Sequence, residues 1–265
     1  MRTIMCYSFK GGSGRSTASA NIAAALAKLG QKVLVVDMDF EAPGLHFVFD
    51  IDVHPDMGIQ DFLKGYIDID RLDKEVVVDA KNKSDDVHFN NLDERSLLLL
   101  NASLRSTDIF SSISEEQLND QMSKLKEYYD DKGFDFMILD AASGIREAFA
   151  LSIDSSDHVL VFFRYSTQHV EGARRAIKLI KTIYDEDVSV QAIASGVPQL
   201  EAESDYSSTA KKIKEERRRI IEVDTSENIA FEIPEIPEFK WKERVITLSN
   251  DNTAYEEIAR SLIGL

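Results

Sequence analysis

Uninterrupted apolar runs alternate along the chain with stretches in which apolar side chains recur every three or four residues. Such runs are typical of strands buried on both faces of a parallel sheet, and the longer spacing is typical of helices. The runs predict strands at 4–7, 32–39, 96–100, 134–140, 158–163, 188–194 and 229–233. The spacing predicts helices at 18–29, 58–65, 114–129, 169–184, 204–222 and 252–263. Because strand and helix alternate, we expect a single α/β domain over 1–265, with a mostly parallel twisted sheet and helices on both faces.

The stretch 66–95 has no clear pattern and is rich in Asp, Asn and Lys. Polar segments of this kind usually run over the surface of a domain, because their backbone groups need water as a partner. We expect a surface insertion here, with a strand at 75–78.

Between the first predicted strand and the first predicted helix, the chain reads S-F-K-G-G-S-G-R-S-T over 8–17. Glycines let successive backbone N–H groups curl around an anion, and the start of a helix adds partial positive charge. This context predicts a phosphate-binding loop that consists of Lys10, Gly11, Gly12, Ser13, Gly14, Arg15, Ser16 and Thr17. Ser16 follows the cation directly and is the expected Mg²⁺ ligand. The alternative is a glycine-rich turn with two incidental cations.

Acidic residues stand at the ends of two predicted strands. Asp37 and Asp39 close the strand at 32–39, and Asp140 closes the strand at 134–140. The carboxyl ends of parallel strands meet at one edge of a sheet, so we expect these aspartates beside the phosphate loop. An aspartate after a buried strand is typical of the acid that binds the magnesium of a nucleotide. The alternative for Asp37 and Asp39 is a polar strand end that caps the next loop.

The K-G-G-x-G-R loop resembles the deviant phosphate loop of the MinD/ParA family of dimeric ATPases, and the resemblance covers most of the chain. Phe9 stands where the usual motif has its first glycine, and Arg15 stands where it has lysine. The resemblance implies that Lys10 reaches across a subunit interface to the partner's nucleotide. It also implies that Arg15 replaces the phosphate-binding lysine.

Further site residues follow from the same resemblance. Asp39 aligns with the aspartate that positions the attacking water, so the implied catalytic residues are Lys10, Arg15 and Asp39. Ser16, Asp37 and Asp140 are the implied magnesium site. The late loop at Ile233-Pro234 would line the adenine of ATP, and its alternative is an ordinary turn.

The function that the resemblance implies is an ATP-dependent switch. ATP and Mg²⁺ join two subunits, the dimer engages a protein partner, and slow hydrolysis separates it. Arg15 keeps a second function class open, a nucleotide-sensing module without significant turnover. A third class is a metabolic ligase or small-molecule kinase on the same fold, with 66–95 forming a substrate pocket.

The formal net charge of −16 counts against a generally adhesive nucleic-acid surface, since the average field repels phosphate. A local exception at 211–219 carries six cations and two glutamates. We expect a solvated helix face with i,i+4 pairs such as Lys211–Glu215 and Lys212–Glu216, and no appreciable binding to nucleic acid. No apolar run approaches the roughly 20 residues that span a bilayer, so we expect a cytoplasmic protein without a membrane partner.

Overall fold

The computed structural model describes residues 1–103, 105, 110, 113–184, 188–199, 205–251 and 253–264. Its centre is an eight-stranded sheet in the order β3-β4-β2-β5-β1-β6-β7-β8. The strands are β1 Arg2–Tyr7, β2 Val33–Met38, β3 Val78–Asp79, β4 Leu97–Leu100, β5 Phe136–Ala141, β6 His158–Phe163, β7 Ser189–Val197 and β8 Ile229–Pro234. All neighbouring strands pair in parallel except β3, which runs antiparallel to β4 at the edge. The mostly parallel sheet confirms the predicted fold class.

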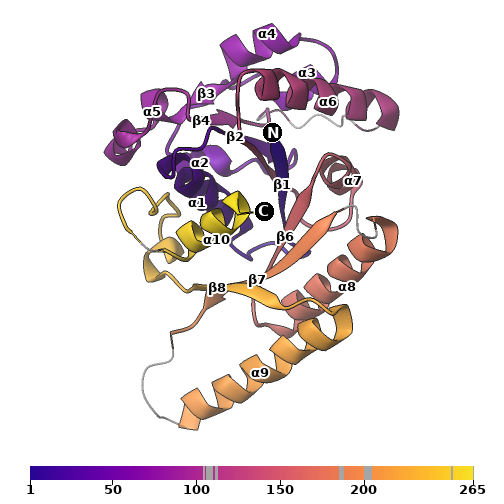
Figure 1. The fold of residues 1–265 in the computed structure, drawn as a ribbon, viewed down its shortest axis with the longest axis vertical. Helices are drawn as coiled ribbons and strands as arrows, with labels where there is room; N and C mark the ends of the chain where they lie inside the picture. Colours follow the sequence, from indigo (N-terminus) through magenta and orange to yellow (C-terminus); the bar gives the residue numbers. More distant parts are fainter. Residues whose placement is uncertain are drawn as a thin grey trace.

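Helices cover both faces of the sheet (Figure 1). They are α1 Arg15–Lys28, α2 Leu45–Phe49, α3 Ile59–Leu63, α4 Ile69–Arg71, α5 Ala80–Lys83, α6 Glu115–Asp131, α7 Glu147–Asp154, α8 Thr167–Tyr184, α9 Asp205–Thr225 and α10 Ala254–Ile263. Short turns of other helix types lie at Leu72–Val76, Val87–Asn91 and Pro237–Lys240. The sequence pattern did not predict α7, and residues 204 and 252 of two predicted helices lie outside the described residues.

The alternation of side chains along each strand divides the core into two layers. Along β1, Ile4 and Cys6 pack in the cluster that includes α1 and α10, whereas Met5 and Tyr7 pack in the cluster that includes α7 and α8. A further cluster joins β2, β4 and β5 to α3 and α6. Because the central strands are buried on both sides, they read as continuous apolar runs in the sequence.

The stretch 66–95 contains short elements that pack against one edge of the sheet. The strand predicted at 75–78 was wrong in position, because the observed β3 is the two-residue pair Val78–Asp79. The residues before it form a π-helical turn in which Leu72 and Val76 are buried in the core. In a helical turn, residues four apart lie on the same face, so Leu72 and Val76 pack against the same core and the strand begins only at Val78.

Among the described residues, no helix is both long enough and apolar enough to cross a bilayer.

Candidate functional site

Three neighbouring central strands bring the predicted phosphate site together. The order β2-β5-β1 places the loop after β1 beside Asp140 of β5 and next to the end of β2. Asp37 and Asp140 are direct partners in the β2–β5 register. All three chain segments leave the sheet at its carboxyl edge, where open α/β sheets bind ligands.

The phosphate loop uses glycine where the backbone needs it. Gly12 has φ +76° and Gly14 has φ +79°, in the left-handed region that side chains rarely adopt. Gly14 is the N-cap of α1, so the start of this helix faces the loop. The conformation is that of a loop whose N–H groups can surround an anion.

The departure at Phe9 has a structural explanation in α8. Its ring packs so closely on Gly172 that a Cβ built there would lie 2.6 Å from the ring atom Cδ1. The ring of His169 also approaches the loop, with Nε2 3.3 Å from the carbonyl oxygen of Gly11. Phe9 therefore anchors the phosphate loop to α8, at the position where the usual motif has glycine.

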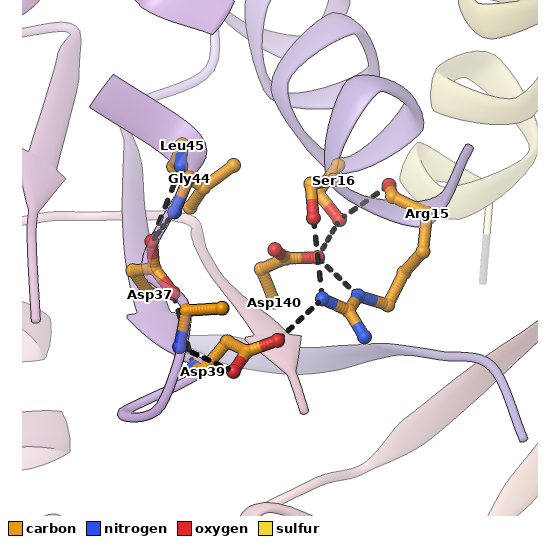
Figure 2. Close-up of polar contacts among 9 residues, drawn as sticks. Arg15, Ser16, Asp37, Asp39, Gly44, Leu45 and Asp140 are labelled. Atoms are coloured by element: carbon orange, nitrogen blue, oxygen red, sulfur yellow. Dashed lines mark hydrogen bonds and ion pairs between the residues drawn. The ribbon is translucent and has the colours of Figure 1, made fainter. Parts of the chain in front are cut away.

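The side chain of Arg15 turns inward and lies among the predicted metal ligands (Figure 2). Its Nε donates to Oδ1 of Asp140 at 2.9 Å, and its Nη2 donates to Oδ2 of Asp39 at 3.3 Å and to Oγ of Ser16 at 3.2 Å. Arg15 is 8% exposed. Burial alone would lower the pKa of Arg15, but the charges of Asp140 and Asp39 raise it above its ordinary value. The structure thus places four of the predicted site residues in one hydrogen-bonded cluster.

Asp37 lies beside this cluster but serves a neighbouring loop. Its carboxylate accepts backbone N–H groups of Asp39 at 3.0 Å, Gly44 at 3.0 Å and Leu45 at 3.2 Å (Figure 2). Burial and the charge of Asp140 raise the pKa of Asp37 to about 7, against the opposing effect of these three donors. The contacts are those of the alternative considered from the sequence, a strand end that caps the next loop. A role of Asp37 near magnesium stays a prediction.

Lys10 has the opposite environment from Arg15. Its side chain is exposed, and it forms no hydrogen bond or ion pair with any residue that the structure describes. One loop therefore carries an inward cation that is held by carboxylates and an outward cation that is open to another molecule.

On the other side of the loop lies a cavity of about 160 Å³. It is lined by Ser13, Gly14, Thr17, Arg164, Ser195, Gly196, Ile233, Pro234, Glu235, Ile236, Phe239, Lys240, Glu243 and Tyr255. Ile233 and Pro234 thus line the same cavity as Ser13 and Gly14 of the phosphate loop, and their contact with adenine stays a prediction. A larger hollow of about 840 Å³ opens at the opposite edge of the sheet, and none of the predicted site residues lines it.

Two residues of this cavity escaped the sequence analysis. Arg164 follows β6 and packs over Gly196, with its Cζ 3.2 Å from an ideal Cβ there. The hydroxyl of Ser195 in β7 donates a hydrogen bond to the carbonyl oxygen of Ser13, which ties the phosphate loop to this strand. The only available signal was position, since both residues stand at the carboxyl end of a buried strand.

The oxygens around Arg15 fit magnesium in their chemistry. Mg²⁺ is a hard cation that uses one or two carboxylates together with phosphate oxygens and water. Asp39, Asp140 and Ser16 supply two carboxylates and a hydroxyl. Among the described residues, no group of three or more His, Cys, Asp or Glu is arranged to hold a metal ion. Two carboxylates and a hydroxyl are three of the roughly six oxygens of a magnesium shell, so water or the phosphates of a nucleotide would supply the rest.

Comparisons with known proteins find relatives over most of the chain. Residues 1–192 match the family model described as "AAA domain". A septum site-determining protein MinD from Synechocystis sp. is 32% identical over 187 residues, which cover 71% of this chain and 61% of that protein. MinD from Bacillus subtilis is 27% identical over 178 residues, covering 67% of this chain and 59% of that protein. The matched segment is thus about three fifths of the length of these relatives.

Solved structures show the same fold. The MinC:MinD cell division protein complex of Aquifex aeolicus matches with a TM-score of 0.74 and 23% identity, over 100% of this chain and 97% of that chain. A ParA family ATPase from Chlorobium tepidum matches with a TM-score of 0.69 and 19% identity, over 100% of this chain and 99% of that chain.

Proposed function

The chain belongs to the MinD/ParA-type P-loop ATPases, and from this premise we propose that it is an ATP-dependent dimerising switch. It binds Mg-ATP, hydrolyses it slowly and regulates or positions a protein partner. The observation that carries the proposal is the different environment of the two cations of the phosphate loop. Arg15 is enclosed by carboxylates, whereas Lys10 is exposed and has no partner among the described residues.

An exposed lysine beside a triphosphate supports nucleotide-dependent dimerisation. A bound triphosphate concentrates negative charge at the loop, so a cation from a second subunit is attracted only when nucleotide is present. In a two-fold dimer, Lys10 of each subunit would reach the nucleotide of the other. The energy of joining the subunits then depends on the outer phosphates, and hydrolysis weakens it.

The remaining site residues take roles that follow from their positions. The backbone of Gly11, Gly12, Ser13 and Gly14 would surround the phosphates, with Ser16 and Thr17 at the start of α1. The cavity that includes Ile233 and Pro234 is small for a separate substrate and suits one base. Magnesium, when bound, would neutralise charge on the outer phosphates, and Ser16 and Asp140 would hold it, with Asp37 nearby.

Asp39 is our candidate for orienting the attacking water, and its contacts favour slow turnover. One carboxylate oxygen accepts from Arg15 and the other accepts the N–H of Ala42 at 3.1 Å. Each oxygen keeps a second lone pair that can accept from water, but taking a proton from that water would cost Asp39 its ion pair with Arg15. The same observation favours the second candidate function, a nucleotide sensor without significant turnover.

The two candidates are separated by measuring specific ATPase activity against protein concentration. A dimerising switch gives an activity that rises with concentration, whereas a sensor binds ATP and shows no turnover at any concentration. Lys10→Ala should bind ATP as the parent does but stay monomeric in size-exclusion runs with a non-hydrolysable ATP analogue. A variant that dimerises like the parent would show that Lys10 acts within its own subunit.

The partner that we propose is a protein and not a nucleic acid. The MinD of Aquifex aeolicus is solved in a complex with MinC, a property of that protein. In this chain, Lys214 and Arg218 of the basic segment are drawn to Glu232, which reduces the charge available to phosphates. A gel shift with duplex DNA at physiological salt should therefore show no binding, with or without ATP.

A further inference from the structure

The guanidinium of Arg15 contacts Ser16 and Asp140, the two residues proposed to hold magnesium, and also the neighbouring carboxylate of Asp39. These contacts are Nε to Asp140 at 2.9 Å, Nη2 to Asp39 at 3.3 Å and Nη2 to Ser16 at 3.2 Å. Magnesium holds its oxygens at roughly 2.0–2.1 Å in a near-octahedral shell. A guanidinium nitrogen at hydrogen-bond distance from the same oxygens leaves no room for that shell. Arg15 and a divalent cation therefore compete for one set of ligands.

We propose that Arg15 makes metal binding at this site conditional on nucleotide. The inference rests on the proposed function, because it assumes that the loop binds the phosphates of a nucleotide. A metal ion alone would have to expel the guanidinium from its carboxylates without giving it a new partner. Phosphate oxygens give the guanidinium that partner, since its planar fork binds phosphate as well as carboxylate. Nucleotide thus releases the ligands of the metal.

Burial makes this competition effective. Asp140 is 1% exposed and Arg15 is 8% exposed, so water screens neither charge well. Asp140 also accepts the hydroxyl of Ser19 at 2.8 Å, which fixes the carboxylate in place. A carboxylate in this environment needs a cation, and Arg15 supplies it from within the chain.

The identity of the side chain at position 15 matters to this competition. The arginine uses two different nitrogens, Nε and Nη2, to join Asp140 to Asp39 and Ser16. Lysine has one ammonium group on a flexible stem and cannot present two donors in a fixed fork. Arg15→Lys should therefore hold the ligands less firmly, and Arg15→Gln should leave them without a cation.

Manganese serves as the probe, because its binding is read directly by electron paramagnetic resonance without any enzyme activity. The wild-type protein without nucleotide should bind Mn²⁺ weakly. Arg15→Gln should bind one Mn²⁺ at least roughly tenfold more tightly, and Arg15→Lys should lie between the two. An unfolded acidic chain would bind many Mn²⁺ ions weakly, so a single tight site is the signal that identifies the folded cluster. Adding a non-hydrolysable ATP analogue should raise the affinity of the wild-type protein for Mn²⁺.

Two controls locate the effect. Arg146→Ala removes an exposed arginine that pairs with Glu41 and does not contact the cluster, so it should leave Mn²⁺ binding unchanged. The double variant Arg15→Gln/Asp140→Asn should lose the gained binding. If both Arg15 variants bind Mn²⁺ no better than the wild type, or if the double variant keeps the gain, the inference is overturned. Failure of the wild type to bind Mg-ATP in calorimetry would instead remove the proposed function, and the metal-only titration would still decide the competition.

Discussion

Two groups of cations in this protein have very different surroundings. Arg15 stands alone in the sequence but lies buried between Asp140 and Asp39 at the centre of the sheet edge. The segment 211–219 carries six cations and lies on α9, at the outer edge of the molecule (Figure 1). The larger number of charges is thus in the place where water screens them most. Burial, and not charge density along the sequence, determines which cation controls the chemistry.

The cations of α9 also differ from their predicted pairing. The pairs Lys211–Glu215 and Lys212–Glu216 are not formed among the described residues, so that prediction was wrong. Instead, Lys214 donates to Glu232 of β8 at 2.5 Å, and the hydroxyl of Tyr165 donates to the same carboxylate at 2.6 Å. A half-buried acid on the sheet attracts the helix's cations more strongly than exposed glutamates on the helix itself.

The largest expected effect is on nucleotide affinity. Arg15→Ala should abolish measurable Mg-ATP binding, because no other inward cation of the loop neutralises the outer phosphates. Arg15→Lys should keep binding, since it keeps the charge. The matched control is Arg217→Ala/Arg218→Ala/Arg219→Ala, which removes three exposed or half-exposed cations and should leave the affinity unchanged. Titration calorimetry measures the affinity of all three variants for Mg-ATP. Equal affinities would show that the buried Arg15 contributes no more to nucleotide binding than the cations of α9.

Turnover should respond next. Asp39→Ala should keep ATP binding but slow hydrolysis by roughly 10²-fold, the usual effect of losing a positioned proton acceptor. The variant should accumulate as the ATP-bound dimer, which light scattering can detect. Steady-state phosphate release measures the rate. Normal turnover would show that Asp39 serves only to hold Arg15 and the loop at Ala42.

A smaller effect is expected on the packing that holds the phosphate loop. Gly172→Ala should lower the free energy of unfolding by about 1–3 kcal/mol, because its Cβ would overlap the ring of Phe9. Gly11→Ala is the control, since a Cβ there meets nothing within 4 Å. Denaturant unfolding of both variants tests this difference. A neutral Gly172→Ala would mean that the Phe9 ring can move away without cost.

The smallest expected effect is on the free energy of unfolding when Glu232, which pairs with Lys214 of α9, is replaced. Burial alone would raise the pKa of Glu232, but hydrogen bonds from Lys214 and Tyr165 bring it below its ordinary value. An acid with a lowered pKa stabilises the fold above its unfolded pKa, and this contribution disappears as the pH falls through the folded pKa. Glu232→Gln should therefore cost about 0.5–1 kcal/mol at neutral pH, and the difference should shrink below about pH 4. Unfolding curves from pH 3 to pH 7 measure it, and a constant difference would contradict the prediction.

Much of the fold and part of the site could be predicted from the sequence. The central strands and long helices follow from hydrophobic periodicity, which is a local property, and the phosphate loop follows from glycine spacing between a strand and a helix. The short edge strand β3 and the helix α7 were misplaced or missed, because their positions depend on packing against distant segments. The position of Asp39 and Asp140 at the carboxyl edge could also be predicted, because the carboxyl ends of parallel strands meet at one edge of the sheet.

Tertiary structure alone decided where the polar side chains of the site point. Arg15 meets Asp140, which lies 125 residues further along the chain, and Phe9 meets a glycine of α8. Asp37 turns to the backbone of its own loop, and Ile233 and Pro234 of the edge strand β8 line one cavity with the phosphate loop. Backbone periodicity is fixed by neighbours in the sequence. The partners of a charge are fixed by burial and by distance in space, which only the folded sheet determines.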